Sequence, residues 1–221
     1  MTLRISSFLH PLALALAIQA TPGCKTTEVH DQATTTADRI EAVGARSGLA
    51  QQRLDATLAA LEQVREKAET DSQPAFKTFS SELAGFETEL GKLVSARGSM
   101  KSAAETWFQQ YETQTASIED AQLREASAKR LTDFRSRVEK VSASVDDLVT
   151  ESESIQGRLE DMRTYLGADL TPKGIEAVEG RIGDLAKDGR NVAEKLGKFS
   201  ESSASAAQAL RSAQPPPAQP K

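Results

Sequence analysis

The sequence contains few side chains that could perform metal, redox or nucleophilic chemistry. Its 221 residues include one cysteine, Cys24, and two histidines, His10 and His30. A single cysteine cannot form an internal disulfide or a cysteine-rich zinc site, and Glu28 with His30 makes too small a ligand set for a metal. The chain also lacks the sequence motifs of a phosphate-binding loop, a zinc-protease helix and a nucleophile elbow. We therefore expect no catalytic residue, no metal, no cofactor and no enzymatic activity.

Cys24 stands where a short apolar leader ends. The mostly apolar run over residues 9–20 is too short to span a bilayer comfortably, but it suits an export signal. The stretch Thr21-Pro22-Gly23-Cys24 resembles the lipobox of bacterial lipoproteins, except that Leu is usual at the first of these positions. The resemblance implies a lipoprotein signal peptide over residues 1–23 and lipidation of Cys24. Ordinary secretory cleavage after Ala20, or an uncleaved anchor with an incidental cysteine, are the alternatives.

The residues after Cys24 indicate where in the cell such a lipoprotein would lie. By resemblance to Gram-negative lipoproteins, Lys25 in place of the Asp associated with inner-membrane retention implies an outer-membrane lipoprotein facing the periplasm. Several acyl chains would hold such a protein stably on the membrane. A soluble periplasmic or secreted protein is the alternative. Residues 24–36 are polar and without hydrophobic periodicity, so we predict a lipidated cysteine followed by a flexible tether.

The composition favours long helices. The chain has 27 Lys and Arg against 32 Asp and Glu, a formal charge of -5, so it lacks the broad basic surface of a nucleic-acid binder. Aromatic residues make up only 5% of the chain, while Ala, Glu, Ser, Leu, Arg and Lys are abundant, which is typical of coiled coils. We expect no nucleic-acid partner.

Hydrophobic residues recur at alternating spacings of three and four in four stretches, over residues 40–68, 76–111, 131–166 and 175–210. This period of 3.5 residues is typical of helices that pack as in coiled coils. Pro74, a slip of register near residues 115–120, and the turn from Gly167 to Gly174 separate the stretches. The sequence therefore predicts four helices.

Short connections make neighbouring helices antiparallel. We therefore predict an all-α fold, an elongated antiparallel four-helix bundle or coiled coil over residues 37–213, followed by a Pro-rich disordered tail over residues 214–221. The alternative is a longer, partly opened coiled coil in which one segment pairs with another chain. Four glycines between residues 180 and 197 and a Ser-rich stretch after them predict that the second half of the last helix is the least stable, and that it detaches when a partner binds.

Arg97 is the one charged residue in the predicted core stripe. It either forms a buried ion pair, with Glu139 as the expected partner, or lays its aliphatic stem on the core and extends its guanidinium into water. In the first case it would set register or take part in an interaction site.

Trp107, Phe108 and Tyr111, with Phe76 and Phe79 upstream, form an aromatic series at helical spacing. Such series usually fill the core of a bundle, but they can also line a cavity for an apolar ligand. Phe108 lies off the stripe beside Trp107, so we expect it to be exposed near a bundle end, where it and Trp107 are candidate partner contacts.

The stretches over residues 107–138 (WFQQYETQTASIEDAQLREASAKRLTDFRSRV) and 163–175 (RTYLGADLTPKGI) resemble the bacterial family known as domain of unknown function 2959. The resemblance covers roughly residues 40–210. It implies an exported, often lipoprotein-like protein that is helical along its length, and it implies no activity. Where the family pattern leads us to expect Lys-His-Asn-Leu-Asn, residues 167–171 read Gly-Ala-Asp-Leu-Thr, so any role of that histidine is absent here.

These observations predict a lipid-anchored cell-envelope protein with a structural, scaffolding or protein-interaction role. It would be held to the membrane through Cys24 and would bind a protein partner in the envelope. A helical binding module for an apolar or lipid ligand is the alternative.

Overall fold

The computed structural model describes residues 23–212, and their side chains from residue 31 onward. This part of the chain forms four long helices and no strand: α1 (Gly23–Glu66), α2 (Gln73–Ala116), α3 (Ala121–Ala168) and α4 (Pro172–Ser212). The predicted all-α fold is confirmed. The leader before Gly23 and the Pro-rich tail lie outside the described residues.

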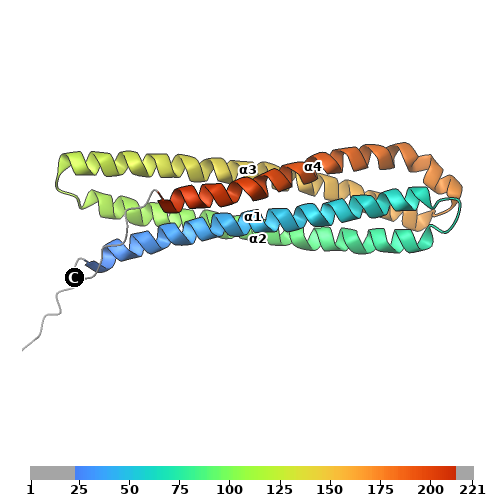
Figure 1. Ribbon diagram of the computed structural model, residues 1–221, viewed down its shortest axis with the longest axis horizontal. Helices are drawn as coiled ribbons and strands as arrows, with labels where there is room; N and C mark the ends of the chain where they lie inside the picture. Colours follow the sequence, from blue (N-terminus) through green and yellow to red (C-terminus); the bar gives the residue numbers. More distant parts are fainter. Residues whose placement is uncertain (1–22, 213–221) are drawn as a thin grey trace, which may run out of the picture.

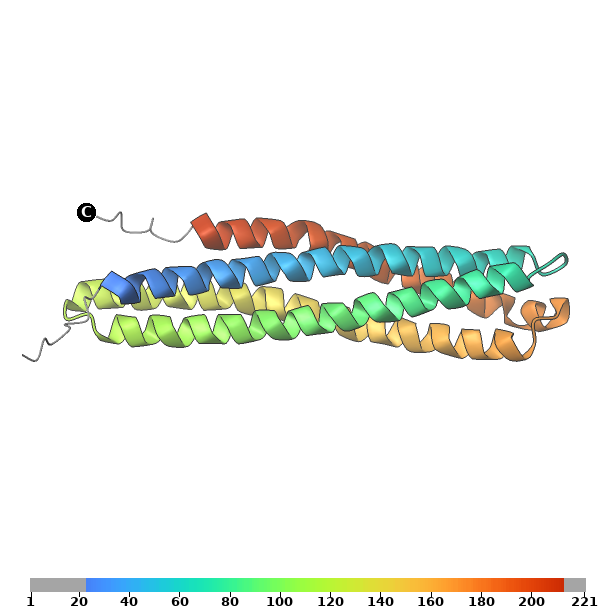
Figure 2. The ribbon, with the colours of Figure 1, turned by 90° about the horizontal axis from the view of Figure 1, so that it is seen from below.

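The helices form an elongated rod in which each runs antiparallel to the next (Figure 1). One end, called here the N-terminal end, holds the start of α1 and the α2–α3 turn (Figures 1 and 2). The opposite end, called the distal end, holds the α1–α2 and α3–α4 turns. At 1.5 Å per residue, the 44 residues of α1 span about 66 Å. The arrangement confirms the predicted helical bundle.

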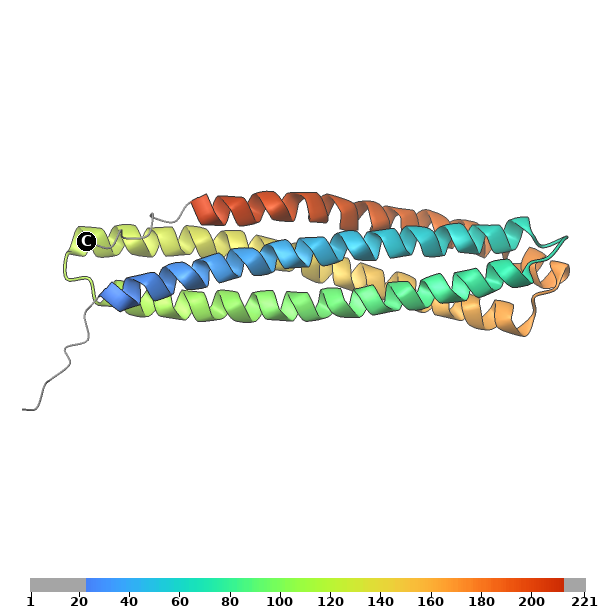
Figure 3. The same cartoon turned by 60° about the horizontal axis from the view of Figure 1, so that its bottom comes forward.

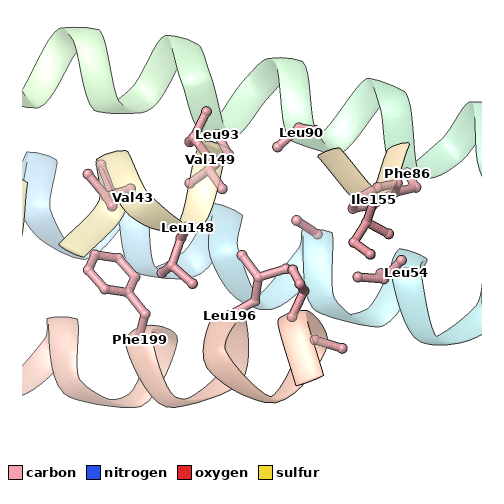
Figure 4. Packing of buried hydrophobic residues seen from close by; sticks show 14 of the residues in the cluster. Val43, Leu54, Phe86, Leu90, Leu93, Leu148, Val149, Ile155, Leu196 and Phe199 are labelled. Atoms are coloured by element: carbon pink, nitrogen blue, oxygen red, sulfur yellow. The ribbon is translucent and has the colours of Figure 1, made fainter. Parts of the chain in front are cut away.

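One continuous hydrophobic core runs along the rod. The buried residues of the four helices follow the predicted spacing of three and four residues. Figure 4 shows Leu54 of α1, Phe86 of α2 and Ile155 of α3 meeting in this interior, each at most 3% exposed. Burial of this apolar stripe is what holds the long helices together, because isolated helices gain little stability in water.

The turns use the residues expected of helix ends. Pro74 lies in the first turn of α2, and Asp120 caps α3 by accepting hydrogen bonds from the backbone N–H groups of Gln122 and Leu123. At the start of α4, Thr171 Oγ1 accepts a hydrogen bond from the N–H of Gly174 at 3.1 Å. Hydrogen bonds from Thr171 also lower the pKa of the Asp169 carboxyl below its ordinary value. The predicted turn between Gly167 and Gly174 thus leads into the last helix, with Thr171 directly before it and Pro172 as its first residue.

The flexible tether predicted over residues 24–36 is wrong, because α1 already begins at Gly23. Ala33 and Thr36 are buried, and they extend the core stripe of α1 backwards at the same spacing. The hydroxyl of Thr36 donates to the carbonyl of Gln32 within the helix at 3.0 Å, so its burial leaves no unpaired donor. A periodicity search that counts only large apolar residues does not detect this stretch.

The packing is uneven around the rod. α1 packs more extensively against α2 and α4 than α3 does. Small residues draw α1 and α4 together: a Cβ atom added at Gly44 would lie 1.6 Å from Ser203 Oγ, and one added at Gly189 would lie 2.8 Å from the nearest atom of Leu58. The second half of α4, predicted to be the least stable part, is therefore closely packed against α1.

Helix α4 stops short of the N-terminal end, while α1 and α3 continue beyond the last turn of α4 (Figures 2 and 3). The last turn of α4 is fixed by Arg211, which pairs with Asp38 and lies 2.7 Å from Glu41 of α1. The opening turns of α3, residues 121–130, are exposed except for the half-buried Ser127, and Leu123 is 62% exposed.

Candidate functional site

Cys24 lies in the first turn of α1, at the N-terminal end of the rod (Figure 1). Its side chain and the leader before it lie outside the described part of the structure. The position nevertheless matters for geometry, because a group attached here would hold the rod by its tip.

Arg97 faces α3 at mid-length. Its Nη1 lies 3.4 Å from Oδ1 of Asp146, and Lys101 Nζ lies 2.7 Å from the other oxygen of the same carboxylate. The side chains of Arg97 and Asp146 are 28% and 39% exposed, so this is a surface pair of modest energy. Glu139, the expected partner, is exposed. The guanidinium therefore reaches the edge of the core and not its centre.

Trp107 and Phe108 belong to the core near the N-terminal end. Trp107 is 1% exposed and Phe108 is 5% exposed, so the predicted exposure of Phe108 is wrong. The Trp107 ring lies 5.3 Å, between centroids, from the rings of both Phe108 and Phe134 of α3. The guanidinium carbon of Arg135 lies 5.0 Å from the Phe108 centroid, and this cation–π contact covers the ring from the α3 side.

The aromatic residues do not form one cluster. Phe76 and Phe79 pack on each other at 6.4 Å near the distal end. Along α2, Phe79 and Trp107 are separated by about 42 Å at 1.5 Å per residue, so they line no common cavity. Both side chains are buried in the core, which gives the predicted apolar-ligand cavity no support from these residues.

A groove lies between α3 and α4 near the distal end and encloses about 550 Å³. Met162, Val178 and Leu185 form its floor and are at most 7% exposed. Each of its two rims carries one arginine and one aspartate. The rims consist of Arg158, Asp161 and Tyr165 on α3, and of Ala177, Arg181 and Asp184 on α4. The groove thus combines an apolar floor with charged edges, which is typical of a site for another polypeptide.

One ion pair closes the inner end of the groove. Arg158 Nη1 lies 2.8 Å from Asp188 Oδ2, across the two helices. Tyr165, which is 39% exposed, donates its hydroxyl to the carbonyl of Gly174 at 3.3 Å. By contrast, the other charged rim residues, Asp161, Arg181 and Asp184, form no ion pair with any described residue.

The described side chains offer no cluster of three or more His, Cys, Asp or Glu residues that could bind a metal ion. Among the described helices, none is both long enough and apolar enough to cross a membrane.

The sequence profile of one protein family, described as Protein of unknown function (DUF2959), matches residues 29–210. The chain belongs to the DUF2959 family. The match spans all four helices and includes the whole distal groove, whereas Cys24 and the leader precede it. No curated protein and no solved structure matches this DUF2959 chain significantly.

The distal groove was not predicted from the sequence. Its rim residues lie off the hydrophobic stripe, so the heptad pattern places them on solvated helix faces. The available signal was the pair of Arg-x-x-Asp spacings, at Arg158 with Asp161 and at Arg181 with Asp184, on helices that the turn makes antiparallel. That signal does not specify how far apart the two helices stand, and this separation creates the groove.

Proposed function

We propose that this DUF2959 protein is a lipid-anchored rod of the bacterial cell envelope with a scaffolding or protein-interaction role. The observation that supports it is the position of Cys24, the single cysteine, at one tip of a rod whose helices span about 66 Å. Acyl chains on Cys24 would fix that tip to a membrane, and the distal groove would project away from the surface. No catalytic step and no nucleic acid enter this proposal.

Acyl labelling tests the anchor directly, because Cys24 is the only cysteine in the chain. Cells expressing the full-length protein would be fed an alkyne analogue of palmitate, and the purified protein would be examined by click labelling and mass spectrometry. We expect label on the wild type, none on Cys24→Ser, and a mature N-terminus at the modified cysteine. An unmodified mature N-terminus at Thr21 would overturn the proposal.

A matched variant separates poor processing from absence of lipidation. Thr21→Leu introduces the residue usual in the lipobox, so we expect it to raise the labelled fraction or leave it unchanged. If Thr21→Leu is labelled strongly and the wild type not at all, the natural chain is not a lipoprotein.

The proposed location is the periplasmic face of the outer membrane. Membrane fractionation should place the wild type with the outer membrane, and Lys25→Asp should move it to the inner membrane, as the resemblance to Gram-negative lipoproteins implies. Equal distribution of the two variants would contradict this placement. In-cell crosslinking of the intact protein would then identify the envelope partners.

A further inference from the structure

The charged rims of the distal groove follow a fixed order along the rod. The ion pairs of Arg158 with Asp188, and of Glu151 with Lys195, set the register of α3 against α4. On this register Asp161 lies level with Asp184, and Tyr165 lies level with Arg181, about one helical turn nearer the distal end. Along the rod toward the distal end, two carboxylates that lie side by side are therefore followed by one guanidinium beside one exposed phenol.

We propose that the distal groove binds the distal groove of a second copy of this chain, in an antiparallel pair related by a twofold axis. This proposal does not rest on acylation of Cys24. Two acylated tips at opposite ends of the pair share one membrane only when the rods lie along its surface. Charge complementarity specifies the occupant. When a second copy runs in the opposite direction, its Arg181 comes beside the acidic residues of the first copy, and the acidic residues of the second copy come beside Arg181 of the first.

The twofold axis crosses the rods between the two levels. Such an axis places α4 against α4 and α3 against α3 of the second copy, running in opposite directions. Asp184 of each copy then lies level with Arg181 of the other, and Asp161 lies level with Tyr165 of the other. Two ion pairs can form, around the floor residues Met162 and Leu185. Each Asp161 carboxylate then lies beside a neutral phenol, whose proton is already donated to the carbonyl of Gly174.

A parallel pair is disfavoured by the same charges. A twofold axis along the rod places α3 of one copy against α4 of the other at equal levels. Asp161 would then face Asp184 across the interface, and Arg181 would face only a neutral phenol. Like charges opposed at an interface repel each other, so the pair of carboxylates favours the antiparallel arrangement.

The antiparallel pair has a characteristic size. The rods overlap only at their distal ends, and α3 extends about 63 Å from the axis to Ala121 at 1.5 Å per residue. The helical part of the dimer is therefore about 125 Å long, with the two N-terminal ends at opposite extremes. Because the overlap is short, the interface is smaller than that of a stable dimer, and we expect a Kd that is micromolar or weaker.

Two single charge reversals test the pairing. Asp184→Arg makes both levels of α4 basic, and Arg181→Asp makes both acidic, so each variant should associate with itself at least about tenfold more weakly than the wild type does. In an equimolar mixture of the two variants, each cation of one chain faces an anion of the other, and dimers should return. Sedimentation equilibrium on the chain from residue 24 onward, with Cys24→Ser and all four helices intact, measures this association.

The controls lie on the same helix. Glu194 and Lys198 form an exposed ion pair outside the groove, so Glu194→Lys and Lys198→Glu should leave association unchanged. Circular dichroism melting would verify that every variant is folded. Small-angle scattering should show a maximum dimension near the expected 125 Å for the dimer.

Three results would overturn the proposal. The first is a wild type that stays monomeric at concentrations up to about a millimolar, the upper range for weak association. The second is a dimer that both charge reversals leave intact, and the third is a mixture of the two variants that stays monomeric. A monomer that instead binds an envelope protein through the groove falls under the first result.

Discussion

The glycines of the bundle differ in how much free space a Cβ atom would find at each position. A Cβ at Gly44 would meet Ser203 Oγ at 1.6 Å and the backbone oxygen of Ser200 at 3.3 Å, so α1 and α4 touch there with no room for a methyl group. At Gly180 and Gly183, nothing lies within 4 Å of the same position. The first glycine is required by close approach, whereas the other two only weaken the helix.

Alanine substitutions at these positions should therefore have opposite effects. Gly44→Ala should lower the free energy of unfolding by about 1–3 kcal/mol, because α1 and α4 must separate to admit the methyl group. Gly180→Ala should raise it by up to about 1 kcal/mol through helix propensity alone. Urea denaturation monitored by circular dichroism compares them, and a Gly44→Ala variant as stable as Gly180→Ala would refute the close α1–α4 contact.

Arg97→Met should leave stability nearly unchanged. The ion pair with Asp146 is partly exposed, and Lys101 remains beside the same carboxylate, so we expect a change within about 1 kcal/mol. Glu139→Gln serves as a control without a predicted effect. If Arg97→Met instead costs about 3 kcal/mol or more in urea denaturation, Arg97 acts as a member of a buried pair.

At the scale of the element, α3 is the helix held least firmly. It packs less extensively against its neighbours than α1 does, and its opening turns extend past the end of α4 (Figure 3). Helix α4, by contrast, keeps Ser203, Ala207 and Leu210 buried to its last turn. We therefore expect the opening turns of α3 to be less stable than the last turns of α4.

Hydrogen exchange should reveal this difference. We expect amides of residues 121–130 to exchange fastest among the four helices, and amides of residues 199–210 to be protected about as well as the segment of α1 that they contact. Exchange measured by mass spectrometry on peptic fragments would resolve the two segments. Faster exchange over residues 199–210 would instead support the detaching second half of α4 predicted from its composition.

The turn between α3 and α4 should make the stability of the protein depend on pH. Hydrogen bonds from Thr171 lower the pKa of Asp169 in the folded protein below its ordinary value of 3.8. A lowered folded pKa means that the stabilisation is fully present above the ordinary value and is lost as the pH falls through the folded value.

Asp169→Asn keeps an oxygen that can accept from Thr171 but removes the charge. The wild type should therefore be more stable than Asp169→Asn at pH 6, and the difference should shrink below about pH 4. Urea midpoints measured between pH 3 and pH 6 provide the comparison. A difference that is constant over this range would show that the carboxylate charge does not stabilise the turn.

At the scale of the whole molecule, the protein is a rod with distinct ends. The N-terminal end holds the start of α1 and the α2–α3 turn, and the distal end holds a groove with charged rims (Figure 1). A rod can separate two binding events by its own length, which suits a scaffold. The single-chain core also argues against the opened coiled coil, since all four helices contribute to one buried cluster.

The length of the isolated rod is a direct check on this architecture. At 1.5 Å per residue, the longest helix, α3 with 48 residues, spans about 72 Å. The Asp184→Arg variant, which should remain monomeric, should show this rod length in small-angle scattering, with a small increment from the terminal segments. A helical rod of twice that length in a monomer would instead indicate that the helices have opened end to end.

The sequence alone determined that there are four helices, where they are separated and which face of each points inward, because a 3.5-residue period and turn residues such as Pro74 and Gly167 are local properties. Only the tertiary structure decided which small or off-stripe residues are buried, as at Ala33, Thr36 and Phe108, since their burial depends on a neighbouring helix. The groove between α3 and α4 likewise depends on the distance between two helices. Periodicity gives the direction of a side chain relative to its own helix, but not how closely the next helix approaches.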